Sequence, residues 1–426
     1  MIYVAVSCAL IVSIILPVFP KHFLLILLVV CRSLCDIGVA QFDRVGVLAI
    51  ASGGIAVAAI IGAILCLLSD ASFTRVALVW SMLCFVGVWS VVAFQIYGIR
   101  SGLLEETVRL VSIVGIFVIA HSVARRRASD YGMAIWMIAP AAIYAISGLV
   151  LGFPNMTIDS GRLTASFSHP NAAAAFFGVG CVVSVLLILA GMSSWRIVFL
   201  IANACALLLT GSLGGIVAAS VGVMVVIALI PNRSPGFRGV WCLAVPLCLA
   251  VSFPVFGLSD RLTEFGGQSS TLAPDSFEWR LQNWRLLIGI WREQPFFGYG
   301  WGSTSIFIQP LGGPPHSAFV QVLVEAGVVG VVLACCAVVY IVIRSIRSAR
   351  RGSMFGTLTC GLVAFALVNG FESNLLGYTA AGYLLAALFG ISVGAADARS
   401  SVVRINPSSS DGKGDDGHVG IFVRFQ

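Results

Sequence analysis

Long apolar segments follow one another along this chain, and short polar segments separate them. A membrane-spanning helix needs roughly 20 apolar residues, because lipid offers the backbone no hydrogen-bond partner. This template predicts an all-α polytopic membrane bundle of about 12 or 13 helices. They are expected near residues 2–16, 23–31, 45–68, 76–97, 104–123, 131–151, 172–190, 195–209, 216–230, 240–256, 318–343, 355–371 and 375–393.

One polar window interrupts the pattern, at residues 259–315. We expect a single membrane domain over residues 1–398, with this window as its large loop. Residues 399–426 are polar and of low complexity, which predicts a disordered tail on the inner face. The first two apolar runs are short and form two helices or one hairpin, so the side of the N-terminus stays open. No cleavable signal peptide is recognised there.

Composition supports the membrane class. Of 426 residues, 59% are hydrophobic and 10% are charged, and the mean hydropathy is +1.02, which leaves too little polar surface for a soluble fold. The 12 cysteines lie mostly in apolar spans, so neither a disulfide framework nor a metal site is expected. No Asp-x-Asp motif or phosphate-binding Gly-Lys loop occurs, so we expect no metal, nucleotide or other cofactor and no nucleic-acid partner.

The arginines predict the orientation of the chain. Basic residues in short loops stay in the cytoplasm, which places residues 125–127 and 344–351 inside and residues 153–169 and 259–315 outside. Arginines on the outer side oppose this rule and need another explanation, such as an anionic ligand held by guanidinium groups. The outer arginines are Arg162, Arg261, Arg280, Arg285 and Arg292.

Three local patterns lie on this outer side. The first is Arg-Leu-Thr-Ala-Ser-Phe-Ser-His-Pro-Asn at residues 162–171, where Asn171 is expected to cap the following helix. The second is a helix from Glu278 with Trp284, Leu287, Ile288 and Trp291 on one face, as in a helix at the membrane interface. The third joins Phe-Gly-Tyr-Gly-Trp-Gly at 297–302, Pro-His-Ser-Ala-Phe at 315–319 and Glu-Ala-Gly at 325–327.

Together these patterns resemble the O-antigen ligase and polymerase superfamily. The similarity covers about residues 161–330. It implies a C-type glycosyltransferase in the bacterial cytoplasmic membrane, with its site on the periplasmic face and an undecaprenyl-diphosphate-linked glycan as donor. The implied partners are this donor, membrane lipids, and a chain-length regulator and flippase of the same pathway. Two departures stand out: Leu213 replaces a family arginine thought to hold diphosphate, and Ser317 replaces an asparagine.

The chemistry expected of such a site needs a base and cations. His316 is the predicted base for the acceptor hydroxyl, since a neutral imidazole accepts a proton near neutral pH. Arg280 is predicted to neutralise the departing diphosphate, and Arg162 is the first candidate to replace the missing arginine at Leu213. The remaining predicted substrate-binding residues are Arg285, Arg261, His169 and Asn171. A base without a covalent nucleophile predicts inversion at the anomeric carbon.

Several functions stay open. Polymerisation of surface polysaccharide repeats is favoured slightly, because the departure at Leu213 suits a divergent exopolysaccharide system. Ligation of a finished glycan to a terminal acceptor such as lipid A core differs only in the acceptor. A transporter or flippase would show repeated halves and polar residues near the bilayer midplane. A non-enzymatic assembly subunit would use the arginines for protein contacts.

Overall fold

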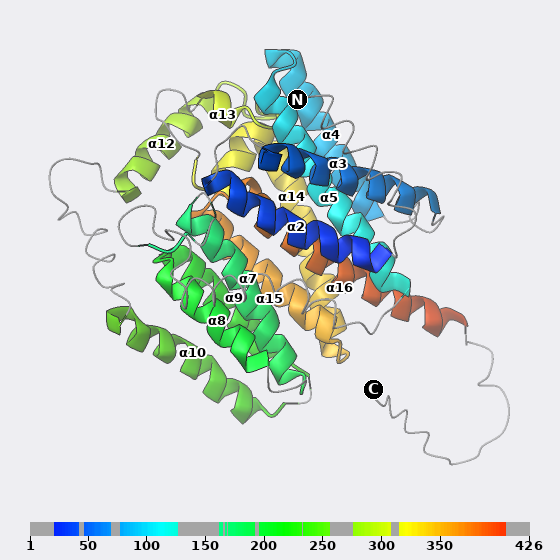
Figure 1. Ribbon diagram of the computed structural model, residues 1–426, viewed down its shortest axis with the longest axis vertical. Helices are drawn as coiled ribbons and strands as arrows, with labels where there is room; N and C mark the ends of the chain where they lie inside the picture. The colour runs from blue at the N-terminus through cyan, green and yellow to red at the C-terminus, as the bar shows by residue number, and fades with distance from the viewer. Residues whose placement is uncertain are drawn as a thin grey trace.

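The structure is a computed structural model that describes residues 21–41, 47–69, 77–126, 162–164, 167, 169–191, 196–231, 233–255, 276–307 and 315–405. Helices dominate this part of the chain, and it contains no strand (Figure 1). The helices are α2 (Lys21–Gln41), α3 (Val47–Ser69), α4 (Ala77–Tyr97), α5 (Ser101–Arg126), α7 (Pro170–Leu189), α8 (Arg196–Leu209), α9 (Leu213–Leu229), α10 (Pro235–Val255), α12 (Ser276–Trp291), α13 (Thr304–Phe307), α14 (Ala318–Arg350), α15 (Met354–Glu372), the 3₁₀ turn η2 (Leu375–Gly377) and α16 (Thr379–Ile405).

The predicted all-α membrane bundle is confirmed. Seven described helices are long and apolar enough to cross a membrane, and α8 and α9 are apolar but shorter. Most predicted spans agree with the helices within a few residues. The spans predicted at 2–16 and 131–151 lie outside the described residues. The molecule is therefore a multi-pass membrane protein.

Two predicted boundaries need correction. The apolar run at 23–31 does not end there, since α2 continues through Arg32 to Gln41. Arg32 has local partners, because its guanidinium lies over the ring of Tyr383 and donates to the Ser52 carbonyl. The last predicted span ends at residue 393, whereas α16 continues to Ile405, and the first strong helix breaker in the sequence after it is Pro407. Residues 406–426 lie outside the described part.

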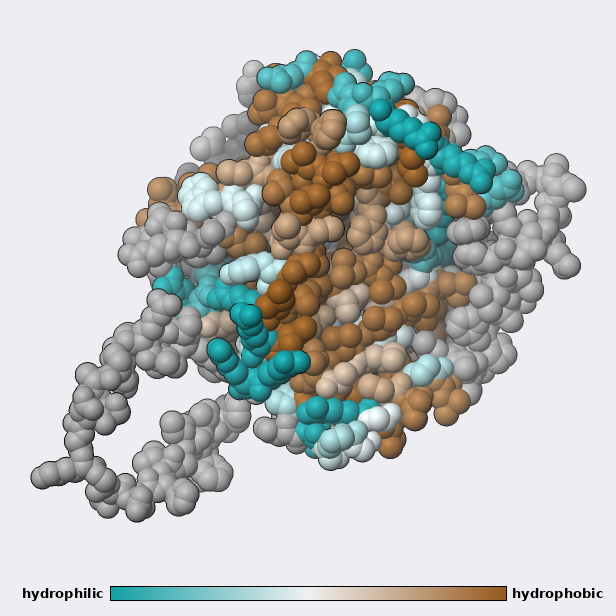
Figure 2. Space-filling model, turned by 180° about the vertical axis from the view of Figure 1, so that it is seen from behind, coloured by the Kyte–Doolittle hydropathy of each residue, from teal (hydrophilic) through white to brown (hydrophobic). Residues whose placement is uncertain are grey.

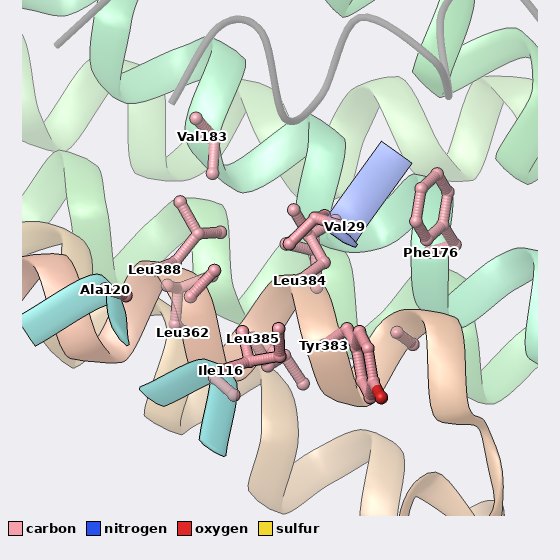
Figure 3. Packing of buried hydrophobic residues seen from close by; sticks show 14 of the residues in the cluster. Val29, Ile116, Ala120, Phe176, Val183, Leu362, Tyr383, Leu384, Leu385 and Leu388 are labelled. Carbon is pink, nitrogen blue, oxygen red and sulfur yellow. The ribbon is translucent and has the colours of Figure 1, made fainter. Parts of the chain in front are cut away.

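The interior is built from small and branched apolar residues. Helix α16 packs along α5, and glycines allow the close approach, since a side chain at Gly390 or Gly394 would meet the backbone of Phe117 and His121. Helix α7 is buried along most of its length and contacts α8, α9, α15 and α16. Figure 3 shows the core where these elements meet, around Phe176 and Tyr383.

The outer surface has the character expected of lipid contact. Figure 2 shows a broad hydrophobic surface with hydrophilic patches toward its edges. Large apolar side chains remain exposed on several helices, among them Leu243 and Leu247 of α10 and Val339 of α14. Such a continuous apolar surface would be costly in water and is stable in a bilayer.

The two ends of the bundle differ in chemistry. At one end, Asp397 of α16 contacts both His121 of α5 and Arg344 of α14. The basic segments that follow α5 and end α14 therefore lie at the same end, as the orientation argument requires. Helix α14 has 33 residues and is about 50 Å long at 1.5 Å per residue, so its first residue, Ala318, lies at the opposite end of the bundle. His316 is two residues before this helix.

Helix α14 is broken near its start. Gly327 has φ 64° and ψ −170°, which is a conformation available essentially to glycine alone. The break leaves carbonyl groups of α14 without helical partners. The glycine loop, residues 297–302, provides donors for them, since the amides of Tyr299 and Gly300 donate to the carbonyls of Val324 and Glu325. The Trp89 indole donates to the Ala326 carbonyl. The loop and the break thus form one structural unit.

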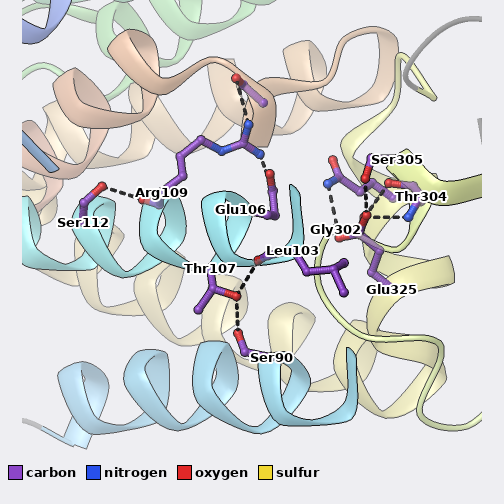
Figure 4. A network of polar contacts seen from close by, with 12 residues as sticks. Ser90, Leu103, Glu106, Thr107, Arg109, Ser112, Gly302, Thr304, Ser305 and Glu325 are labelled. Atoms are coloured by element: carbon purple, nitrogen blue, oxygen red, sulfur yellow. Dashed lines mark hydrogen bonds and ion pairs between the residues drawn. The ribbon is translucent and has the colours of Figure 1, made fainter. Parts of the chain in front are cut away.

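A buried polar network supports this unit (Figure 4). The carboxylate of Glu325 accepts hydrogen bonds from Thr304 and from Gln321, and it is fully buried. Nearby, Glu106 forms an ion pair with Arg109, whose guanidinium also reaches the Gly377 carbonyl at 3.4 Å. These contacts join α13 to α14 and α5 to the turn η2.

Candidate active site

His316 lies in a short, tightly held turn before α14. The Trp284 indole of α12 donates to the Pro315 carbonyl at 2.6 Å. Ser317 caps α14 by accepting a hydrogen bond from Val320, and the Ala318 amide donates to the Ser373 carbonyl at the end of α15. Serine and asparagine are both good caps, which explains why serine is accommodated where the superfamily has asparagine.

The backbone of His316 is unusual. It has φ 49°, and no other non-glycine residue in the described part of the chain has a positive φ. This left-handed conformation costs an L-residue about 1–2 kcal/mol. Such strain is found where the surrounding structure fixes a functional side chain. Here it turns the imidazole toward α7 and α12.

Two aromatic rings surround this imidazole. The Trp279 ring packs edge-on at a centroid distance of 5.4 Å, and the His169 ring lies 5.6 Å away. Burial, the charge of Arg280 and the proximity of His169 together lower the pKa of His316 to about 4. The imidazole is therefore neutral at neutral pH. Its Nδ1 atom is inaccessible and has no hydrogen-bond partner among the described residues.

His169 and Asn171 lie at the beginning of α7, where the cap of the helix is His169 and not Asn171. His169 is the N-cap, and its Nδ1 accepts a hydrogen bond from the Asn171 amide at 3.1 Å. The expectation that Asn171 caps this helix is wrong, because Pro170 already occupies the first helical position, where its lack of an N–H has no cost. The Asn171 side chain instead accepts from Arg162 at 3.4 Å.

Arg162 lies on the turn between α8 and α9. Its Nε donates to the Thr210 carbonyl at 2.8 Å, and a side chain at Gly211 would contact the guanidinium. Leu213, where the superfamily has arginine, follows this turn as the first residue of α9. The Arg162 guanidinium therefore lies against the turn where the family arginine is missing. Arg162 itself belongs to a different segment, the one before α7.

Arg280 extends from α12 toward the end of α15. Its guanidinium forms an ion pair with Glu372 at 3.5 Å. The charges of Arg280, Glu372 and Arg162 all act on the Tyr378 hydroxyl, so Tyr378 lies near all three. Burial is the main cause that raises the pKa of Tyr378. The two arginines, the two histidines and Asn171 thus converge from α7, α12 and the turns before α9 and α14.

Two of the outer arginines do not join this group. Arg285 is exposed on α12, because five residues after Arg280 correspond to a rotation of about 140° around the helix. Arg292 is exposed as well, just beyond the end of α12. Arg261 lies outside the described residues. The apolar face of α12 packs Leu287 against Tyr299 and Val324, so this face contacts protein.

Sequence reasoning missed Glu372 as a member of the site. A single carboxylate at the end of an apolar helix has no recognisable motif, and only the fold brings it to Arg280. The tryptophans were assigned mainly to interfacial anchoring, whereas Trp279 and Trp284 contact His316 and its turn. Among the described residues there is no group of three or more His, Cys, Asp or Glu side chains suited to a metal ion.

Comparison with known proteins supports the predicted family relationship. A family model described as O-antigen ligase matches residues 197–335. This match confirms the predicted relationship to the O-antigen ligase and polymerase superfamily. The matched region contains Arg280 and His316, while Arg162 and Glu372 lie on either side of it. Comparison with curated proteins found no match. At family level the function is therefore of the O-antigen ligase and polymerase type.

Proposed function

We propose that this protein transfers a glycan from an undecaprenyl-diphosphate donor to a sugar hydroxyl, outside the cytoplasmic membrane, and so polymerises surface polysaccharide repeats. One observation carries the proposal. A neutral, half-buried imidazole lies in one cluster with two guanidinium groups, at the end of the bundle opposite the basic cluster. A base next to cations is what displacement of a diphosphate by an alcohol requires.

The reaction follows from this arrangement. The neutral imidazole of His316 accepts the proton of the acceptor hydroxyl while the oxygen forms a bond to the anomeric carbon of the donor. The bond from that carbon to the phosphate oxygen breaks, and the undecaprenyl diphosphate leaves with the electron pair. Arg280 and Arg162 neutralise the charge that develops on the leaving group. A single displacement inverts the configuration of the anomeric carbon.

Arg162 compensates for the departure at Leu213 in this proposal. Its Nε is held by the Thr210 carbonyl, so the guanidinium is fixed beside the turn that would otherwise carry the family arginine. An arginine presents a planar set of donors suited to phosphate oxygens, and a fixed one loses little entropy on binding. Arg285 and Arg261 remain proposed contacts of the donor outside this group.

Ligation is the second candidate, because the matching family model is described as O-antigen ligase. Deleting the gene and analysing cell glycans by gel and mass spectrometry separates the two reactions. Accumulation of single lipid-linked repeats supports polymerisation. Accumulation of long lipid-linked chains supports ligation, and unchanged glycans contradict both. The proposed partners within the pathway are a flippase that delivers the donor and a regulator of chain length.

A further inference from the structure

Glu372 is the one carboxylate described within this cluster of cations. It ends α15, pairs with Arg280 at 3.5 Å, and lies within electrostatic range of Arg162. Its side chain is 24% exposed, while that of Arg280 is 14% exposed. Because these side chains are largely shielded from water, an unpaired guanidinium charge would cost free energy, and a counter-ion lowers this cost.

The backbone of α9 makes room for this carboxylate. A methyl group added at Gly214 would overlap the Glu372 carboxylate, and the three atoms nearest to it all belong to the Glu372 side chain. Gly214 belongs to the first turn of α9, three residues after Gly211, against which Arg162 lies. The carboxylate and the Arg162 guanidinium thus lie against the same short segment, residues 211–214.

A carboxylate and a diphosphate offer arginine the same kind of oxygen acceptor. Both cannot occupy the space beside Arg280, since two anions at such a distance repel each other. We propose that Glu372 is a built-in counter-ion that occupies the diphosphate position in the empty site and gives up Arg280 when the donor binds. This inference rests on the proposed function, because it takes the diphosphate donor as the competing anion.

The exchange has a functional consequence. The cations remain balanced and correctly oriented between turnovers, and only a ligand that brings its own negative charge displaces the carboxylate without leaving Arg280 unpaired. Neutral lipid headgroups are rejected for the same reason. Glu372 is therefore a positioning and selectivity residue, and it takes no part in bond formation.

Binding of inorganic pyrophosphate to the purified full-length protein in nanodiscs tests this exchange. Two variants remove the competitor differently: Glu372→Gln removes its charge at constant size, and Glu372→Ala removes the carboxylate altogether. Both are expected to bind pyrophosphate about tenfold more tightly than the parent, the change that a charged hydrogen bond of ordinary strength produces. Glu278→Gln is the matched control, because it removes an exposed carboxylate from α12 and should change nothing.

The outcomes are distinct. Tighter binding in both test variants, lost again when Arg280→Ala is added, supports the exchange. Unchanged or weaker binding in Glu372→Gln, or equal gains in Glu278→Gln, overturns it. If the gene deletion alters cell glycans while Glu372→Gln binds no more tightly, only the exchange fails. If Glu372→Gln binds more tightly while the deletion leaves glycans unchanged, the exchange holds for an anion and the proposed reaction fails.

Discussion

Replacing His316 separates its chemistry from its backbone strain. Alanine at this position removes the base, but it also keeps a left-handed conformation that costs about 1–2 kcal/mol for an L-residue. Asparagine tolerates that conformation better than most residues. His316→Asn therefore removes the proposed base while preserving the turn between Pro315 and Ser317.

The expected loss of rate follows from general base catalysis. A positioned base contributes about 10²–10⁴-fold to a rate, which corresponds to about 3–5 kcal/mol of activation free energy. His316→Asn should lose this amount in kcat, because the arginines that bind the donor are untouched. The KM for the donor should change by less than about threefold.

Transfer by purified protein measures this directly, with a synthetic polyprenyl-diphosphate glycan as donor and thermal unfolding as the control for folding. His316→Asn should melt near the parent temperature and His316→Ala below it, while both lose the rate. His22→Asn makes the same exchange on α2 and should keep full activity. A His316→Asn protein that folds normally and retains more than about a tenth of the parent rate would refute the assignment of His316 as base.

Three further predictions follow from the same geometry. Because the pKa of His316 is about 4, kcat/KM should stay level as the pH falls from 7 to 5 and decline only near pH 4. Bound diphosphate offsets the charge of Arg280, so on acidification kcat should begin to fall at a pH above 4. A kcat/KM that halves near pH 6.5 would contradict this. Trp284→Phe removes the hydrogen bond to the Pro315 carbonyl and should lower kcat more than Trp291→Phe, which removes a similar bond to the Pro295 carbonyl. Equal losses would show that the Trp284 hydrogen bond does not hold the turn that carries His316. Gly327→Ala should destabilise the protein by about 1–3 kcal/mol in unfolding experiments, because alanine is strained in the backbone conformation of Gly327. Gly289 lies in open space on α12, so Gly289→Ala should leave stability unchanged. Equal melting temperatures of the two variants would contradict the break in α14.

The sequence predicted the helices well because lipid imposes a simple rule on apolar length. It failed at α2, where Arg32 interrupts the apolar run but finds partners on α3 and α16. Such compensation depends on neighbouring helices and is invisible in a single segment. The side of the membrane on which each end lies stays a prediction, although the shared end of His121, Arg344 and Asp397 agrees with it.

The site was predicted in part. Arg162 and Arg280 are predicted because positive charge on the outer side requires a reason, His316 is predicted as a base, and the structure brings the three together. Arg285 was selected for the same reason and lies elsewhere, which helical geometry alone would have shown. Glu372 could not be found from the sequence, since its partner is 92 positions away along the chain.

A glycine-rich loop such as residues 297–302 is compatible by sequence with either a structural turn or a phosphate-binding site. The structure favours the first role, because the amides of Tyr299 and Gly300 are used by the carbonyls of α14. A glycine pattern shows only that the backbone comes close to something. What it approaches, here the break at Gly327, depends on a segment that the pattern does not contain.

Cryo-electron microscopy with a bound donor tests the central claim most directly. The sample is the full-length protein in nanodiscs with a non-cleavable phosphonate analogue of the undecaprenyl-diphosphate glycan. We predict that the two phosphorus groups lie between Arg280 and Arg162, with the anomeric carbon facing His316 and the Glu372 carboxylate turned away. A donor bound outside this cluster, or with its sugar directed away from His316, would contradict the account.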